Sequence, residues 1–497
     1  MPYDVDLSAL VTAHGVRGTV PGELDVEVVR ALGTAFAESV LDDAEVLSPP
    51  RVVVGRDMRE SGVALQAAFV EGLTSAGADV VDLGLASTET LCFASASLAA
   101  PAAIVTAGHC EAGKNGVKLW SLATTPIGPG TGLEELCARA TQVLRGEGPP
   151  GPSVARTGEV VPGDVLADYA RHLRSVVDLA GIRPLKVVVD AGNGMAGLTV
   201  PAVLGEGANR AVELVPVFFD LDGRFPFHDA DPAAAVNLLD LQTAVVANHA
   251  DLGIAFDGDA DRCLVVDERG AVVSTSAVMV LVGLQLLDRA RAEGQTVTML
   301  HTPVVSRAVP EILGGSGART VPLTGPADRV AARMLETDAV LTGAPRGRLH
   351  YRDFFGCDSG MLTALYVVAA VGNQTLALSE LVEIVEPYSG SGAVASRVAD
   401  ASAALERVVE AYVTNEGAGA VEVDESDGLL VSHWDEIPRW WFHLRVDDAP
   451  TGPGGRSTVW LVVEAADEDI MDKVRDDVLA LVRELDPAPE GEDETDE

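Results

Sequence analysis

The chain has few aromatic residues, and it lacks any long uninterrupted hydrophobic run. Aromatic residues make up 4% of its 497 residues and hydrophobic residues 47%, so valine, leucine and alanine must build the cores. Such cores are typical of parallel sheets covered by helices. No apolar stretch is long enough to span a bilayer, and the start MPYDVDLSAL has no basic or apolar region typical of a signal peptide. We therefore expect neither a membrane span nor a secretory leader.

Cysteines are also scarce. The five cysteines are scattered and form no CxxC pair: Cys92, Cys110, Cys137, Cys263 and Cys357. An odd number of cysteines without metal-ligand spacing predicts reduced thiols and a cytoplasmic protein.

Basic residues are few for a chain of this length. The 35 lysines and arginines stand against 75 acidic residues, which gives a formal net charge of −40. This charge argues against a nucleic acid partner or an anionic membrane surface, because both require basic patches. An anionic substrate would need a local basic pocket. The acidic, proline-containing segment 486–497 is predicted to be a disordered tail.

Hydrophobic periodicity alternates between strand and helix along most of the chain. A helical pattern separates expected strands at 51–55 and 78–84, a strand runs into a glycine-rich turn and a helix at 184–197, and 251–270 is expected to hold two strands around an acidic loop. The last part alternates like antiparallel strands and ends in an amphipathic helix. We expect three α/β units and a final α+β unit. The expected boundaries are 1–150, 151–270, 271–385 and 386–485.

The acidic loop FDGDADR is the first candidate site. Asp257, Asp259 and Asp261 occupy alternate positions, and three converging carboxylates repel one another unless a cation lies among them. Oxygen-only ligands favour a hard cation such as Mg²⁺. A calcium loop of the EF-hand type is an alternative because Glu268 occupies the twelfth position, but Arg262 stands where that loop needs glycine. A solvated acidic turn, partly neutralised by Arg262, is the other alternative.

Five sequence motifs together resemble those of the α-D-phosphohexomutase superfamily, and most of all its bacterial phosphomannomutase/phosphoglucomutase branch. They are VRG near the start, TA-x-H followed by NGVK, VVVDAGNGMAG, DGDADR and YRDFFGCDSGM. The resemblance implies an α/β fold of four domains around a central cleft, with three similar α/β domains of mixed sheets and a C-terminal α+β domain. It also implies a Mg²⁺-dependent reaction that moves phosphate between the 6- and 1-hydroxyls of a hexose, through a phosphoserine and a sugar bisphosphate.

The catalytic loop departs from the pattern of that superfamily. The family motif Thr-Ala-Ser-His-Asn-Pro aligns with TAGHCE, so Gly108 occupies the phosphoserine position. Glycine has no group that can carry a phosphoryl group, and the metal would lose one ligand. The resemblance still implies Lys118 as an acid/base candidate and His109 as an active-site residue. It also implies that Arg17 meets an anion or braces the loop.

The sugar-selecting loop is altered too. The family motif Gly-Glu-x-Ser-x-His becomes GAPRGR, in which Ala344, Arg346 and Arg348 replace the Glu, Ser and His. We consider Arg346 and Arg348 as an altered anion- or partner-binding loop, with drift at an unused surface as the alternative. A related region at 325–330 is ambiguous, because Asp328-Arg329 resembles the Gly-Asp-Arg of some members.

The phosphate loop expected in the last domain keeps little of its pattern. Arg445 alone clearly matches and is a substrate-binding candidate, while Asp447 and Asp448 would repel a phosphate.

These changes predict a catalytically impaired or non-catalytic family member. It would keep a Mg²⁺ loop that is weakened by the loss of the phosphoserine. One alternative is an active phosphosugar mutase of altered specificity or with another nucleophile, for which His109, Thr106 and Ser121 are candidates. Another is a binding or scaffold subunit whose protein partner the sequence does not name. A phosphosugar is the expected small ligand.

Overall fold

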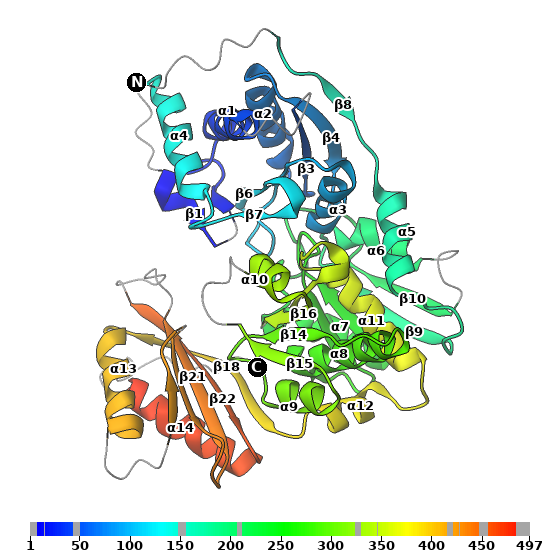
Figure 1. The fold of residues 1–497 in the computed structure, drawn as a ribbon, viewed down its shortest axis with the longest axis vertical. Helices are drawn as coiled ribbons and strands as arrows, with labels where there is room; N and C mark the ends of the chain where they lie inside the picture. Colours follow the sequence, from blue (N-terminus) through cyan, green and yellow to red (C-terminus); the bar gives the residue numbers. More distant parts are fainter. Residues whose placement is uncertain are drawn as a thin grey trace. The chain divides into compact units, whose positions relative to one another are not determined.

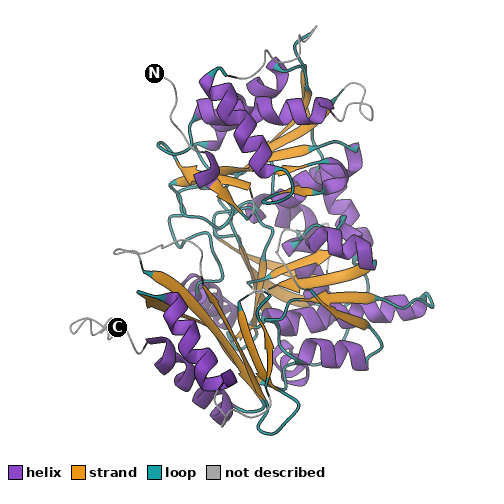
Figure 2. Cartoon of the chain, turned by 60° about the vertical axis from the view of Figure 1, so that its left-hand side comes forward, coloured by secondary structure: helices purple, strands orange, loops and turns teal. Residues whose placement is uncertain are grey.

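The computed structural model describes residues 7–13, 15–42, 50–147, 156–205, 211–323, 330–344, 346–414, 421–426, 428–446 and 456–483. The chain forms two compact units. Unit 1 comprises Met1–His301, Ile312–Val321 and Ala327–Val382, and unit 2 comprises Thr302–Glu311, Pro322–Pro326 and Glu383–Glu497. Figure 1 labels the elements, and Figure 2 shows helices lying against the faces of the sheets.

The first sheet of unit 1 is mixed. Along its order β1–β2–β6–β5–β3–β4–β8, the pairs among β5, β3, β4 and β8 are parallel and the others antiparallel. The strands are β1 (Val11–Thr12), β2 (Gly15–Thr19), β3 (Arg51–Arg56), β4 (Asp79–Leu85), β5 (Ala102–Val105), β6 (Lys114–Trp120), β7 (Pro126–Ile127) and β8 (Val160–Pro162). The helices are α1 (Val26–Asp42), α2 (Gly62–Ser75), α3 (Thr88–Leu98) and α4 (Leu133–Arg145).

Two of these helices approach each other unusually closely. A Cβ atom at Gly72 of α2 would lie 2.1 Å from the carbonyl oxygen of Arg30 in α1, and one at Gly33 would lie 2.3 Å from that of Phe69. Only glycine allows such an approach. The strands predicted at 51–55 and 78–84, with a helix between them, are confirmed as β3, α2 and β4.

The second sheet carries the acidic loop. Its order is β10–β9–β11–β12–β13, where β9 pairs in parallel with both neighbours and the other pairs are antiparallel. Residues 257–262 join two paired strands, as the sequence predicts. The strands are β9 (Leu185–Asp190), β10 (Val212–Val217), β11 (Leu252–Phe256), β12 (Cys263–Asp267) and β13 (Val272–Val273), and the helices are α5 (Leu166–Val176), α6 (Ala196–Leu204) and α7 (Leu239–Asn248).

The third sheet has the order β15–β14–β16–β17, with β14 parallel to β16 and β17 antiparallel to β16. The strands are β14 (Thr298–His301), β15 (Arg319–Pro322), β16 (Ala339–Ala344) and β17 (Arg348–Tyr351). The helices of this part of the chain are α8 (Thr275–Ala292), α9 (Ala308–Gly315), α10 (Val330–Thr337), α11 (Gly360–Gly372) and α12 (Leu378–Val385).

Unit 2 holds a wholly antiparallel sheet of order β18–β22–β21–β20–β19. Its strands are β18 (Ser389–Val398), β19 (Glu422–Asp424), β20 (Leu429–His433), β21 (Trp440–Val446) and β22 (Ser457–Ala465), and its helices are α13 (Ala401–Val409) and α14 (Glu468–Arg483). Val408, Val474 and Val478 pack with Phe442 and Leu461 in one core. The predicted fold class, three α/β sheets and a final antiparallel α+β unit, is confirmed.

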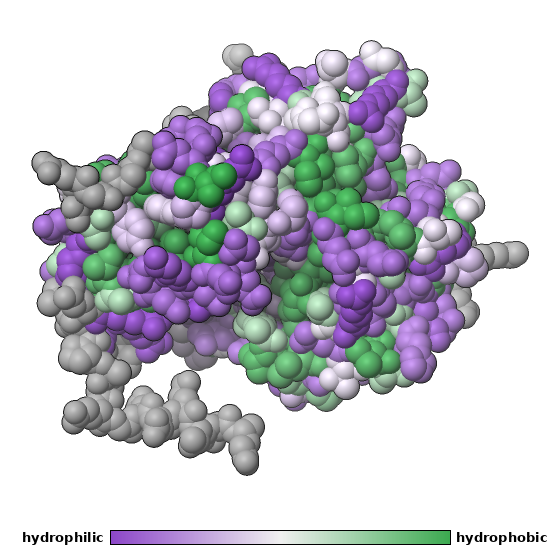
Figure 3. All heavy atoms as spheres, turned by 90° about the horizontal axis from the view of Figure 1, so that it is seen from below, coloured by the Kyte–Doolittle hydropathy of each residue, from purple (hydrophilic) through white to green (hydrophobic). Residues whose placement is uncertain are grey.

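Hydrophilic residues dominate much of the face drawn in Figure 3, with hydrophobic residues gathered in separate spots. Within the described ranges, no helix combines the length and apolar character that a bilayer crossing requires. The predicted tail at 486–497 lies outside the described residues.

Candidate active and metal site

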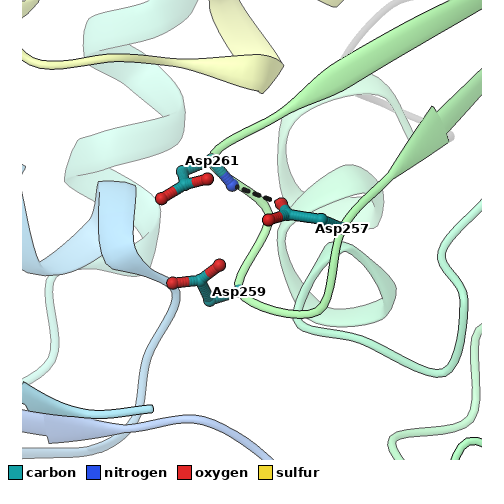
Figure 4. A group of neighbouring side chains, drawn as sticks. All are labelled: Asp257, Asp259 and Asp261. Carbon is teal, nitrogen blue, oxygen red and sulfur yellow. Dashed lines mark hydrogen bonds between the residues drawn. The ribbon is translucent and has the colours of Figure 1, made fainter. Parts of the chain in front are cut away.

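The acidic loop between β11 and β12 brings three buried carboxylates together. Asp257, Asp259 and Asp261 are each at most 2% exposed. Asp257 Oδ1 accepts hydrogen bonds from the backbone N–H groups of Asp261 and Arg262, both at 3.0 Å. Figure 4 shows the three side chains converging around a shared space. The loop therefore folds back on its first carboxylate and points all three inward.

Each aspartate leaves one buried oxygen without a hydrogen bond from the described residues: Asp257 Oδ2, Asp259 Oδ1 and Asp261 Oδ1. One ligand atom from each residue lies within 4.8 Å of the others. A buried carboxylate oxygen without a donor is costly unless a cation meets it. An oxygen-only set of this kind suits Mg²⁺ or another hard divalent cation. The spacing of the aspartates in the sequence predicted this cluster.

Lys118 and Thr88 donate hydrogen bonds to the second carboxylate oxygen, Oδ2, of two of these aspartates. Lys118 on β6 is 6% exposed, and its Nζ donates to Asp259 Oδ2 at 2.6 Å and to Asp261 Oδ2 at 2.8 Å. Thr88 Oγ1 also donates to Asp259 Oδ2, at 2.5 Å. Outer contacts of this kind orient the remaining oxygens toward a metal. In Asp259 and Asp261, Oδ2 thus accepts hydrogen bonds from the protein, while Oδ1 stays available to a metal.

The charges in this cluster shift the pKa values strongly. Burial lowers the pKa of Lys118, but Asp259 and Asp261 outweigh burial and raise it, so the side chain stays charged. Burial raises the pKa of Asp261, but Lys118 and Arg348 outweigh burial and hold it well below its ordinary value. The pKa of Asp257 is raised well above its ordinary value by burial and by its two acidic neighbours. A bound divalent cation would relieve this repulsion and keep Asp257 ionised.

Gly108 lies against the acidic loop. Its φ is +56°, and a Cβ atom there would lie 3.0 Å from Asp259 Oδ1 and 3.3 Å from Arg17 Nη2. A Cβ atom at Gly258 would lie 2.6 Å from the carbonyl oxygen of Gly108, so the two loops touch through their backbones. A side chain at position 108 would therefore meet one of the three oxygens that suit a metal.

A buried ion pair between Arg59 and Asp57 supports the Gly108 loop. Arg59 Nη2 donates to the carbonyl oxygens of Gly108 at 2.9 Å and Cys110 at 2.5 Å, and Nη1 donates to that of Glu111 at 2.6 Å. Asp57 receives Arg59 Nε at 3.2 Å and the hydroxyl of Thr106 at 2.7 Å. These contacts hold the backbone of the Gly108 loop in place.

Arg17 and His109 lie at the same loop. Arg17 Nη1 donates to Cys110 Sγ at 3.4 Å, and its buried Nε makes no hydrogen bond with the described residues. Burial, followed by the charges of Arg262 and Arg17, lowers the pKa of His109 to about 2. His109 is therefore a neutral imidazole at physiological pH.

The three arginines from the acidic and sugar loops take different positions. Arg262 is 6% exposed and lies 3.6 Å from Asp231 and 3.8 Å from Asp257. Arg346 is half-exposed and reaches Asp231 at 3.4 Å. Arg348 turns inward: its Nε lies 2.9 Å from Asp358 Oδ2, and its Nη2 lies 3.7 Å from Asp261 Oδ1. The sugar loop of the sequence prediction therefore contributes one arginine to the acidic site and one to the surface.

The remaining predicted residues lie in unit 2 or outside the described residues. Arg445 is an exposed residue of β21 in unit 2. The loop that follows it, with Asp447 and Asp448, lies outside the described residues, as do Pro345 and residues 325–329 of the ambiguous region at 325–330.

Sequence reasoning missed the residues that reach the site from other elements. Thr88, at the start of α3, donates its backbone N–H to the Asp259 carbonyl at 3.2 Å in addition to its hydroxyl contact. Asp231 and Asp358 pair with the arginines of the site. Thr88 and Asp231 lie in none of the quoted motifs, and Asp358 lies in YRDFFGCDSGM without a role that the sequence assigned to it.

Comparisons with known proteins agree with this architecture. Family models of phosphoglucomutase/phosphomannomutase α/β/α domains I, II and III match residues 9–143, 167–270 and 274–388. A phosphomannomutase of Escherichia coli is 31% identical over 477 residues, which cover 95% of this chain and 98% of that protein. The phosphohexose mutases of Xanthomonas campestris are 32% identical over 437 residues, covering 87% and 91% of the respective chains.

Solved structures give the same result for the whole chain. A phosphoglucomutase/phosphomannomutase family protein of Burkholderia thailandensis superposes with a TM-score of 0.80 at 28% identity, covering 97% of this chain and 98% of that chain. The N-acetylphosphoglucosamine mutase of Aspergillus fumigatus, solved with GlcNAc-6P and magnesium, shares the fold at a TM-score of 0.58 and 14% identity, covering 96% and 95%. The chain therefore belongs to the phosphoglucomutase/phosphomannomutase family, within the α-D-phosphohexomutase superfamily.

Proposed function

We propose that this chain is a phosphomannomutase-like protein of carbohydrate metabolism that binds Mg²⁺ and a phosphosugar but does not pass a phosphoryl group through a serine. The observation that carries the proposal is Gly108, whose missing side chain would face Asp259 and Arg17. Covalent phosphoryl transfer needs an oxygen, nitrogen or sulfur nucleophile, and glycine offers none.

Two nearby hydroxyls are already engaged. Thr106 Oγ1 donates to Asp57 at 2.7 Å and accepts from the Gly108 N–H at 2.9 Å, so it is part of the loop brace. Ser121 Oγ donates to the carbonyl oxygen of Thr125 at 3.3 Å. These contacts argue against either residue as a replacement nucleophile.

His109 supports a second candidate function, an active mutase with a histidine nucleophile. A pKa near 2 leaves its imidazole neutral, which is the form that attacks phosphorus. The altered sugar loop speaks against this candidate, since transition-state contacts must be present together and their losses do not add independently.

The proposal that Mg²⁺ and a phosphosugar still bind is supported by buried acceptor and donor atoms that lack a hydrogen-bond partner among the described residues. Among the described residues, three buried carboxylate oxygens have no hydrogen bond, and neither do Arg17 Nε and the buried Nε and Nη1 atoms of Arg262. Acceptors of this kind suit Mg²⁺, and guanidinium donors suit a phosphate. Bound Mg²⁺ would polarise the phosphate and stabilise the negative charge on its oxygens. The A. fumigatus relative was solved with a phosphosugar and magnesium, which makes the same pair the natural ligands to test.

A cytoplasmic location is part of the proposal. It is supported by the cysteines, since all five are free thiols and four of them are buried.

Intact-mass spectrometry after incubation with glucose 1,6-bisphosphate and Mg²⁺ tests the proposal, beside a mutase assay with mannose and glucose phosphates. We expect no stable phosphorylated protein and no turnover. Phosphorylation that disappears in acid and in His109→Gln, together with turnover in the wild type, would establish the second candidate instead. An acid-stable label with turnover would refute both candidates, since it would indicate a hydroxyl nucleophile.

A further inference from the structure

Arg348 bridges two carboxylates that belong to different sheets of unit 1. It is the first residue of β17, and its side chain is 15% exposed. Its Nε lies 2.9 Å from Asp358 Oδ2, next to the start of α11, and its Nη2 lies 3.7 Å from Asp261 Oδ1 in the acidic loop. The guanidinium thus connects the altered sugar loop with the acidic loop.

The oxygen that Arg348 approaches is one that a metal would use. Asp261 Oδ2 already receives Lys118 Nζ at 2.8 Å, while Asp261 Oδ1 is buried and accepts no hydrogen bond from the part of the chain that the structure describes. A divalent cation among the three aspartates would therefore share Asp261 Oδ1 with a guanidinium. A guanidinium and a divalent cation that meet at the same carboxylate in a buried site repel each other strongly.

We propose that Arg348 is an internal competitor of the divalent cation, which lowers the affinity of the Asp257–Asp259–Asp261 site and links it to the sugar loop. Asp358 sets the strength of this competition. Its carboxylate lies closer to the guanidinium than Asp261 does, 2.9 Å against 3.7 Å, and so draws the positive charge away from the cation. The inference rests on the proposed Mg²⁺ site and deepens it.

A purely structural bridge between two domains is the rival explanation. Removing one partner of such a buried ion pair would destabilise the fold. The loss of such a bridge would not raise the affinity of a metal site for its cation. The two explanations therefore predict changes in different quantities, the free energy of unfolding and the dissociation constant of the cation.

Calorimetric titration of the full chain with Mn²⁺ and Mg²⁺ at fixed ionic strength tests the competition. We expect Arg348→Gln to bind the cation on the order of tenfold more tightly, because a repelling charge is gone. Arg348→Lys keeps the charge and should stay close to the wild type. The matched control is Arg346→Gln, whose half-exposed side chain pairs with Asp231 at 3.4 Å, and we expect it to change affinity less than about twofold.

Asp358→Asn gives an expectation of opposite sign. It should weaken cation binding, because the guanidinium is released toward Asp261. This loss should shrink in the Arg348→Gln background if it acts through the arginine, which a double-mutant cycle measures. Thermal unfolding without metal confirms that each variant is folded, and Asp358→Asn tests the proposal even if Arg348→Gln does not fold.

Unchanged or weaker binding by folded Arg348→Gln, or an equal effect of Arg346→Gln, would overturn the inference. If wild type, Arg348→Gln and Asp259→Ala all fail to bind a cation, the metal site falls together with it. Phosphoryl labelling of the protein would refute only the proposed loss of transfer and would leave the binding comparison valid.

Discussion

At the scale of the residue, Gly108 combines two constraints. Its φ of +56° lies in the left-handed region, and the space beside it is already filled by Asp259 and Arg17. The proposed loss of the nucleophile and a left-handed backbone conformation therefore coincide at Gly108. Putting the serine back would not simply restore the loop of an active relative.

We predict that Gly108→Ser and Gly108→Ala each lower the free energy of unfolding by about 1 to 2 kcal/mol, the cost of a left-handed non-glycine residue. Urea denaturation measures the change. Gly113 of the same loop is the control, because a Cβ atom there meets nothing within 4 Å, so Gly113→Ala should stay within about 0.5 kcal/mol. A serine that costs far less than alanine would mean that its hydroxyl finds a partner and that the loop tolerates the family residue.

At the scale of the element, the loop between β5 and β6 depends on one buried arginine. Arg59 is 1% exposed, pairs with Asp57, and also donates to the Lys114 carbonyl oxygen at 3.0 Å. Its planar guanidinium satisfies several backbone carbonyls that would otherwise be buried without donors.

We predict that Arg59→Ala lowers the free energy of unfolding by about 3 to 5 kcal/mol, because it leaves Asp57 as an uncompensated buried charge. Arg59→Lys should recover only part of the loss, since an ammonium cannot span the carbonyls. Chemical denaturation measures both. Arg171→Ala is the control: that side chain is 71% exposed and pairs with Asp168, so we expect a change within about 0.5 kcal/mol. Equal effects of Arg59→Ala and Arg171→Ala would show that the loop does not need its brace.

At the scale of the whole molecule, Glu89 connects helical segments from the three α/β domains of unit 1. It lies on α3 and accepts hydrogen bonds from Tyr169 Oη at 2.6 Å, Ser359 Oγ at 2.7 Å and the Met361 N–H at 2.9 Å. Burial raises the pKa of its carboxyl to about 8, although these three donors lower it. The group therefore couples the assembly of three domains to pH.

The sign of this coupling follows from the raised pKa. Between about pH 4.3, where glutamate titrates in an unfolded chain, and pH 8, the folded protein holds a proton that the unfolded chain has released. The free energy of unfolding should therefore fall as pH rises through this window. In Glu89→Gln, the free energy of unfolding should fall less over this window. The difference is at most about 1.4 kcal/mol for each unit by which folding raises the pKa of Glu89. Urea denaturation between pH 5 and 9 with EDTA measures the slope, and equal slopes in the two proteins would contradict the prediction.

Much of the fold could be predicted from the sequence, because strand and helix periodicity is local. The Val-rich segments at β3, β4 and β9 and the turn that bears the three aspartates lie where the pattern predicts them. The resemblance also identified Gly108 as the changed position, since a motif keeps its spacing when one residue differs. Two loops that the resemblance identified, at 325–329 and after Arg445, lie outside the described residues, so the structure does not test them.

Linear order alone therefore determined the fold class and the acidic triad, and it carries the proposal that the nucleophile is missing. The tertiary structure decided which charges meet. Thr88 and Arg59 act on loops that are distant in sequence, and the guanidinium of Arg348 lies between Asp358 and Asp261. The physical reason is that periodicity follows from each residue's own neighbours along the chain, whereas the partner of a buried charge is set by the packing of separate domains.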